Sequence, residues 1–163
     1  MFHFDYYKKI ADDLSGFYKG SDPAADAGIR TSISRYYYYI FHKYKETIYN
    51  LLTVPTIDEL MKIKSHRIHE LISNIMTYYN KTNVAGELIK LRRLRNLCDY
   101  NKTEIVGAIQ YLSAQSMVLT LEQALSSIIT GAELNGAFKR ALSEIKQKQR
   151  QAANKWHPST GSG

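Results

Sequence analysis

Apolar residues along most of this chain recur at steps of three and four, the spacing of one face of an α-helix. The clearest stripe lies within residues 23–50 and consists of Ile33, Tyr37, Phe41 or Ile40, Tyr44 and Ile48. No segment shows the strict alternation of apolar and polar residues that marks a half-buried strand. The pattern therefore predicts an all-α protein.

Glycine, proline and capping signals divide this pattern into five helices. Gly20 closes the first helix, and Pro23 stands in the first turn of the second. Thr56 begins a capping box for the third helix, and Gly131 ends the fifth. The predicted helices cover residues 4–19, 23–50, 57–80, 84–99 and 103–129. Five helices with short connections predict an antiparallel bundle over residues 1–131.

The C-terminal part differs in composition from this bundle. Residues 132–155 favour a helix but are rich in Lys, Arg and Gln, so we expect a basic helical extension. Residues 156–163 read WHPSTGSG and predict a disordered tail.

In the fifth helix we expect an apolar face that consists of Ile105, Ile109, Leu112, Met117, Leu121, Leu125 and Ile128.

The composition excludes several classes of protein. The chain is 44% hydrophobic and 23% charged, which is typical of a globular domain. No apolar run approaches the 18 or so residues of a transmembrane helix, and we expect no membrane association. A single cysteine, Cys98, rules out an internal disulfide framework and favours a reducing cytoplasm. No histidine pair has the spacing of a zinc protease, and we expect neither metal nor cofactor.

The formal net charge of +7 is concentrated in two stretches. Residues 90–102 hold five cations and one carboxylate, and residues 139–155 hold six cations and one carboxylate. The two stretches together exceed the charge of the whole chain, so the remainder is slightly acidic. Concentrated positive charge favours an acidic partner, most often a nucleic acid.

Arg92, Arg95 and Asp99 share one face of the fourth predicted helix with Asn96. A row of guanidinium groups suits phosphate, because each can donate two parallel hydrogen bonds. The alternative is a solvated face on which Arg95 and Asp99 form an i, i+4 ion pair. The chain also has 13 tyrosines, for which two roles are open. Tyr36 to Tyr39 occupy a full helical turn and so cannot all face one way. Some of them must lie in the core, while others line an interface or stack on bases.

Two segments resemble the motifs of HEPN (higher eukaryotes and prokaryotes nucleotide-binding) domains. Residues 33–41, ISRYYYYIF, resemble the ISRxYYxxF helix of the family, and residues 95–100, RNLCDY, resemble its RxxADY element. The resemblance covers roughly residues 4–130. It implies a compact helical bundle that forms a homodimer. It also implies an origin in a prokaryotic defence or toxin–antitoxin module, in which many members are metal-independent endoribonucleases.

The chain departs from the R-x4-6-H active-site motif of those ribonucleases. Tyr100, Asn101 and Lys102 occupy the positions after Arg95 where histidine is expected. A frame that starts at Arg93 places Cys98 in the histidine position, followed by Tyr100. Neither frame supplies the group that would accept the proton of the RNA 2′-OH.

Two hypotheses follow from the resemblance. In the first, the protein binds RNA and cleaves it if another group replaces the histidine. Arg95, Asn96, Tyr100 and Lys102 are then the catalytic candidates, and Lys90, Arg92, Arg93 and Arg35 bind RNA. In the second, the protein is a catalytically silent module for a protein partner such as a nucleotidyltransferase or a larger effector. Structural or interface roles then fall to Tyr37, Tyr38 and Asp99.

Overall fold

The computed structural model describes residues 3–17, 23–52, 59–60, 62–101, 103–128 and 131–156. These residues form six helices and no strand, which confirms the all-α prediction. The helices are α1 (Asp5–Phe17), α2 (Pro23–Leu51), α4 (Ser65–Tyr78), α5 (Thr82–Tyr100), α6 (Ala108–Leu125) and α7 (Ala132–Trp156).

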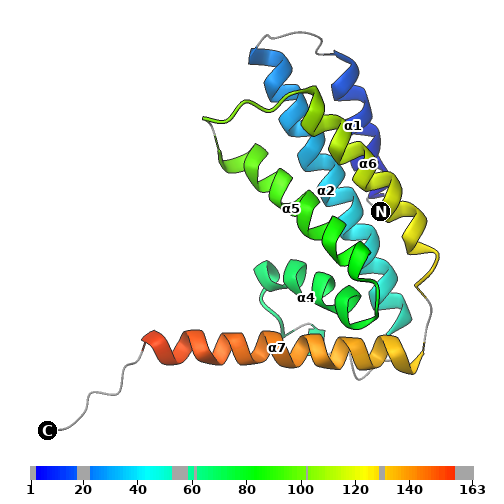
Figure 1. Cartoon of the computed structure of the whole chain (residues 1–163), viewed down its shortest axis with the longest axis vertical. Coiled ribbons are helices and arrows are strands. Elements are labelled where there is room, and N and C mark those ends of the chain that lie inside the picture. The colour runs from blue at the N-terminus through cyan, green and yellow to red at the C-terminus, as the bar shows by residue number, and fades with distance from the viewer. Residues whose placement is uncertain are drawn as a thin grey trace, which may run out of the picture.

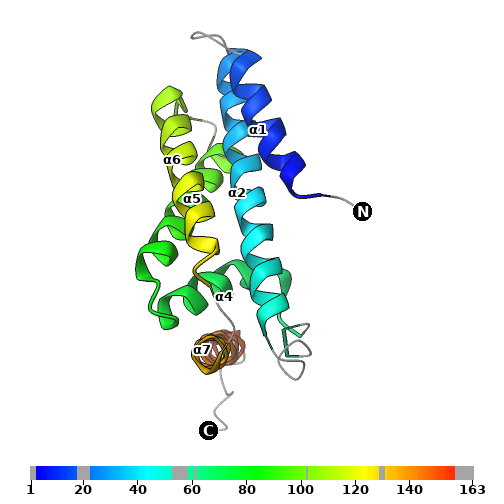
Figure 2. The ribbon, with the colours of Figure 1, turned by 90° about the vertical axis from the view of Figure 1, so that its right-hand side faces the viewer.

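Helix α2 is the centre of the arrangement. It packs against α1 on one side and against α5 and α6 on the other (Figure 2). Its predicted stripe is buried at Ile33, Tyr37, Ile40, Tyr44 and Ile48, while Phe41 is only partly buried. Since the apolar face of α2 meets helices on two sides, this long helix supplies the middle of the core.

Helix α7 is part of the fold and not only an extension. It lies across one end of the molecule and packs on α4 (Figure 1). Its inner face buries Leu134, Ala137, Phe138, Ala141, Leu142 and Ile145. The expected five-helix bundle with a basic extension is not confirmed, because the described residues form six helices and α7 buries an apolar face of its own, with its Lys148 contacting Glu70 of α4 at 2.7 Å. The predicted disordered tail, apart from Trp156, lies outside the described residues.

Two helices begin later than the sequence indicates. Residues 62–64 form a turn, and α4 begins at Ser65, whereas the predicted capping box at Thr56 lies outside the described residues. A turn follows α4 as predicted, with Asn80 at a positive φ of 59°, but it is shorter than the predicted residues 80–83 because α5 begins at Thr82. Helix α6 begins at Ala108, after five positions that the apolar spacing had placed in a helix.

The predicted apolar face of α6 is correct only in its second half. Ile105, Ile109 and Leu112 are 85%, 82% and 59% exposed. Of the predicted face, Leu121 in α6 and Ile128 beyond it are buried. The other buried positions are Ala114 and Val118 in α6 and Val106 in the preceding loop, which the prediction did not include. Apolar residues surround α6 on all sides, so spacing alone could not indicate which side faces α2.

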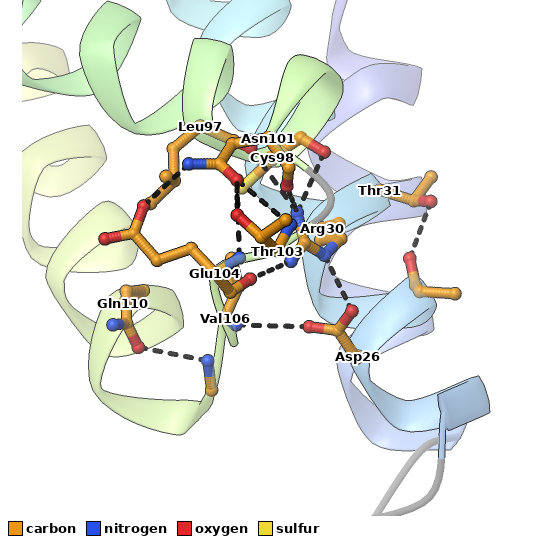
Figure 3. A network of polar contacts seen from close by, with 12 residues as sticks. Asp26, Arg30, Thr31, Leu97, Cys98, Asn101, Thr103, Glu104, Val106 and Gln110 are labelled. Atoms are coloured by element: carbon orange, nitrogen blue, oxygen red, sulfur yellow. Dashed lines mark hydrogen bonds and ion pairs between the residues drawn. The ribbon is translucent and has the colours of Figure 1, made fainter.

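The side chain of Arg30 explains the late start of α6. Its Nη1 atom donates to the carbonyl oxygens of Cys98 at 3.2 Å and Asn101 at 2.8 Å, and more weakly to that of Leu97 at 3.4 Å (Figure 3). Its Nη2 atom donates to the carbonyl oxygen of Glu104. The last carbonyls of a helix have no intrahelical partner, so these bonds end α5 and hold the loop after it.

Asp26 and Asn101 complete this connection. Asp26 Oδ2 accepts from Arg30 Nε at 2.7 Å, and its Oδ1 atom accepts from the Val106 amide at 3.2 Å. Asn101 Oδ1 accepts from the Thr103 amide at 3.0 Å, which forms a local turn. The chain between α5 and α6 is thus held by polar bonds to α2 that no helical periodicity can signal.

We expect Arg30→Met to lower the free energy of unfolding by about 2–4 kcal/mol, because several acceptors would lose a charged donor. Urea denaturation of the variant and the wild type measures this difference. Arg93→Met is the matched control, since Arg93 is an exposed arginine of α5. Equal stability of the two variants would contradict a structural role for Arg30.

Candidate nucleic-acid interface

Arg95 is the centre of a polar cluster between α2 and α5. Its Nε atom lies 2.7 Å from Oδ2 of Asp99, and its side chain is 16% exposed. Its Nη1 atom donates to Asn96 Oδ1 at 3.1 Å, and its Nη2 atom donates to the hydroxyl of Tyr38. The predicted i, i+4 pair of Arg95 and Asp99 is therefore present.

Three tyrosine rings surround the guanidinium group of Arg95. Its central carbon lies 5.9 Å from the ring centre of Tyr37, 5.1 Å from that of Tyr38 and 5.3 Å from that of Tyr100. At these distances an arginine is attracted to the faces of aromatic rings. Although burial opposes the charge, the neighbouring Asp99 carboxylate raises the pKa of Arg95, so this cation is permanent.

Asp99 also joins the two helices. Its Oδ1 atom accepts a hydrogen bond from the hydroxyl of Ser34 on α2, while Oδ2 holds Arg95. A hollow of about 280 Å³ lies beside this contact, and Arg35, Tyr38 and Asp99 contribute to its lining. The guanidinium carbon of Arg35 lies 5.5 Å from the ring centre of Tyr7. The lining combines Arg30 and Arg35 with one tyrosine, Tyr38, and single-stranded nucleic acid sites use the same residue types.

A histidine that the sequence analysis did not connect with the arginines lies in the same cluster. His69 of α4 shares a hydrogen bond through Nδ1 with the hydroxyl of Tyr37. Its ring centre is 3.9 Å from that of Phe41. Burial, followed by the charges of Arg92 and Arg95, lowers the pKa of His69 to about 4. No spacing in the sequence links His69 to these arginines, because the turn between α4 and α5 brings them together.

The remaining predicted RNA-binding residues do not share one surface. Arg92 lies one helical turn before Arg95 on α5, and its charge contributes to lowering the pKa of His69. Lys90 and Arg93 instead line a groove of about 480 Å³ between α5 and α6, where Lys90 Nζ lies 2.8 Å from Glu87 Oε1. Lys102, a catalytic candidate, lies outside the described residues. The side chains near Arg95 are therefore Arg92, Asn96, Tyr100, Tyr37, Tyr38 and Asp99.

Metal and thiol chemistry find no support in the described part of the chain. No group of three or more His, Cys, Asp and Glu side chains there could hold a metal ion. Cys98 is buried on the inner side of α5, and burial raises the pKa of its thiol to about 11. A protonated, enclosed thiol is a poor nucleophile, so Cys98 packs as an apolar residue.

Comparisons with known proteins leave the function open. No family model and no solved structure matches the chain. The chain is similar to an uncharacterized protein of Methanocaldococcus jannaschii, with 27% identity over 139 residues, which are 78% of this chain and 77% of that protein. None of the described helices is long and apolar enough to cross a bilayer. The geometry of the cluster is thus the main evidence for function.

We expect Cys98 of the folded protein to react with iodoacetamide about 100-fold more slowly than in urea-unfolded protein, because its raised pKa removes the thiolate. Mass spectrometry of the alkylated protein at pH 7.5 measures both rates. A rapid reaction of the folded protein would restore Cys98 as a candidate nucleophile.

Proposed function

We propose that this protein is a HEPN-type RNA-binding protein of a prokaryotic defence or toxin–antitoxin module. The observation that carries the proposal is the cluster on α2, α4 and α5, in which Arg92 and Arg95 adjoin Tyr37, Tyr38 and His69. Cations attract the phosphate backbone, and ring faces stack on bases without selecting a sequence. Similarity to an archaeal protein supports the prokaryotic setting.

The two arginines have different roles in this proposal. Arg95 already binds Asp99, Asn96 and Tyr38, so it positions the cluster and contributes a fixed charge. Arg92 has no ion pair with a carboxylate among the described residues, so its guanidinium group is available for phosphate. We therefore assign the principal phosphate contact to Arg92.

We expect Arg92→Ala to weaken binding of a uridine dodecamer about tenfold and to reduce the salt slope by about one, because one phosphate contact is lost. Fluorescence anisotropy between 50 and 200 mM NaCl measures both quantities. Arg93→Ala is the matched control, since Arg93 is the next residue but faces the α5–α6 groove. Salt-independent binding, or equal weakening by both variants, would contradict the proposal.

RNA cleavage is tested separately from RNA binding. Total RNA is incubated in the absence of divalent metal, once with the wild type and once with Arg95→Ala. The melting temperatures of the two proteins are measured first, and they must be equal for the comparison to hold. Cutting by the wild type alone supports an endoribonuclease that lacks the histidine of the family motif. Binding without cutting supports an RNA-binding protein that does not cleave, an outcome that the commitment of Arg95 to Asp99 also favours.

The outer face of α6 supports the homodimer that this function implies. Ile109 and Leu112 are largely exposed, as are Leu119 on the same helix and Ile105 in the loop before it. Helix α6 contains one charged residue, Glu122, which accepts a hydrogen bond from Tyr39 at 2.6 Å. This face of α6 carries no charge of its own, and Lys90 and Arg93 of α5 line the groove that Ile109 borders, so the apolar side chains of two copies can pack against each other beside these cations.

We expect the wild type to be a dimer and Ile109→Asp a monomer, because a carboxylate in an apolar interface would be buried without a partner. Size-exclusion chromatography with light scattering measures the mass of each. Ala152→Asp, on an exposed part of α7, is the control and leaves the dimer intact. A monomeric wild type at 100 μM would exclude this interface.

A further inference from the structure

His69 is held in place by contacts on two sides of its ring. Its Nδ1 atom shares a hydrogen bond with the Tyr37 hydroxyl, and its ring centre lies 5.5 Å from that of Tyr37 and 3.9 Å from that of Phe41. Arg95 lies over the same Tyr37 ring, with its guanidinium carbon 5.9 Å from the ring centre. The imidazole and the guanidinium group therefore flank one tyrosine.

The charged groups that act on His69 are all basic. They are Arg92 and Arg95 from α5, and His42 and Lys45 from α2. Two carboxylates of the neighbouring helices are already engaged: Asp99 holds Arg95, and Glu70 on the α7 side of α4 lies 2.8 Å from Arg67 and 2.7 Å from Lys148. Asp99 balances Arg95 alone, and among the described residues neither Arg92 nor Lys45 forms an ion pair with a carboxylate.

A half-buried imidazole beside several cations, of which only Arg95 is paired with a carboxylate, is an incomplete arrangement in electrostatic terms. Burial and the two arginines keep His69 neutral at pH 7, since its pKa is lowered to about 4. An anion bound between the arginines would offset their repulsion and favour the protonated ring. A phosphodiester fits, because it supplies one negative charge and acceptor oxygens for both arginine and imidazolium donors.

We propose that His69 completes a phosphate site with Arg92 and Arg95, and that it takes up one proton from solvent when an RNA phosphate binds there. This inference rests on the proposed RNA-binding function. It assigns one more residue, His69, to the phosphate site and couples binding to the uptake of a proton. Binding and protonation are then linked, so RNA binds more tightly as the pH falls. No covalent bond is made or broken in this step.

The other histidines provide controls for this linkage. His66 lies one turn before His69 on α4 and is exposed, so His66→Gln removes an imidazole of the same helix that lies outside the cluster. His42 faces His69 from α2 and stacks on Phe4 with ring centres 4.2 Å apart. Burial and Lys45 lower the pKa of His42 as well, so it is the second histidine that must be tested.

The probe is a 2′-O-methyl-uridine dodecamer with hydroxyl ends, which resists cleavage at the 2′ position and has no group that titrates between pH 5.5 and 7.5. We expect the wild type to bind it about tenfold more tightly at pH 5.5 than at pH 7.5, if phosphate returns the pKa of His69 to its ordinary value. His69→Gln should bind with less than about twofold change over this range. His66→Gln and His42→Gln should retain most of the wild-type pH dependence.

A measurement on the wild type guards against a folding defect in His69→Gln. NMR titration of the His69 ring protons, with and without the dodecamer, follows protonation directly. A rise in the titration midpoint on binding confirms the inference. Tight, salt-dependent binding with an unchanged midpoint, or pH dependence that persists in His69→Gln and disappears in His42→Gln, would overturn it and leave the proposed function intact. Absence of binding at low salt would overturn both.

Discussion

The carbonyl groups at the C-terminal end of α5 require hydrogen-bond donors, and one side chain of α2 supplies several of them. Arg30 donates to four carbonyl oxygens between Leu97 and Glu104 and is held by Asp26. This contact sets where α5 ends and how the chain turns toward α6. Because Arg95 and Asp99 lie in the last turns of α5, the position of the candidate site depends on the same contact.

The tyrosines of α2 show how polar groups can tie a helical core together. The hydroxyl of Tyr36 bonds to Asp12 of α1 and lies 3.0 Å from the hydroxyl of Tyr111 on α6. The hydroxyl of Tyr44 donates to the carbonyl oxygen of Leu121 at 2.9 Å. Each ring fills space in the core while its hydroxyl forms hydrogen bonds to the neighbouring helices, to α1 and α6 from Tyr36 and to α6 from Tyr44. Burial raises the pKa of both tyrosines, so their hydroxyls stay protonated at neutral pH.

The candidate site combines one arginine that is paired with a carboxylate and other basic groups that have no such pair among the described residues. Arg95 is fixed by Asp99, whose other oxygen accepts from Ser34, so its role is to organise the surface. Arg92 and His69 lie beside it without a carboxylate of their own among the described residues. Water can solvate such a surface, and a bound anion would further stabilise it by reducing the repulsion between the basic groups.

Part of the site was predictable from the chain because its residues are close in sequence. Arg95 and Asp99 are one helical turn apart, so the α-helix alone brings them together. The ISRYYYYIF and RNLCDY segments also led to α2 and α5, and Ser34 and Tyr38 do meet Arg95 and Asp99. His69 escaped notice because its partners lie on other helices, and contacts of that kind leave no periodic signal.

Helix formation along this chain follows from local properties, such as the apolar spacing, Pro23 and the turn at Asn80. For this reason the sequence by itself determined an all-α protein. The tertiary structure decided which sides of the helices are buried. Helix α6 is apolar all round, so only its packing on α2 shows that Ile109 faces outward and Leu121 inward. Likewise only the packing of α4 on α2 and α5 places His69 beside the arginines, because electrostatic neighbours depend on distance in space and not on separation along the chain.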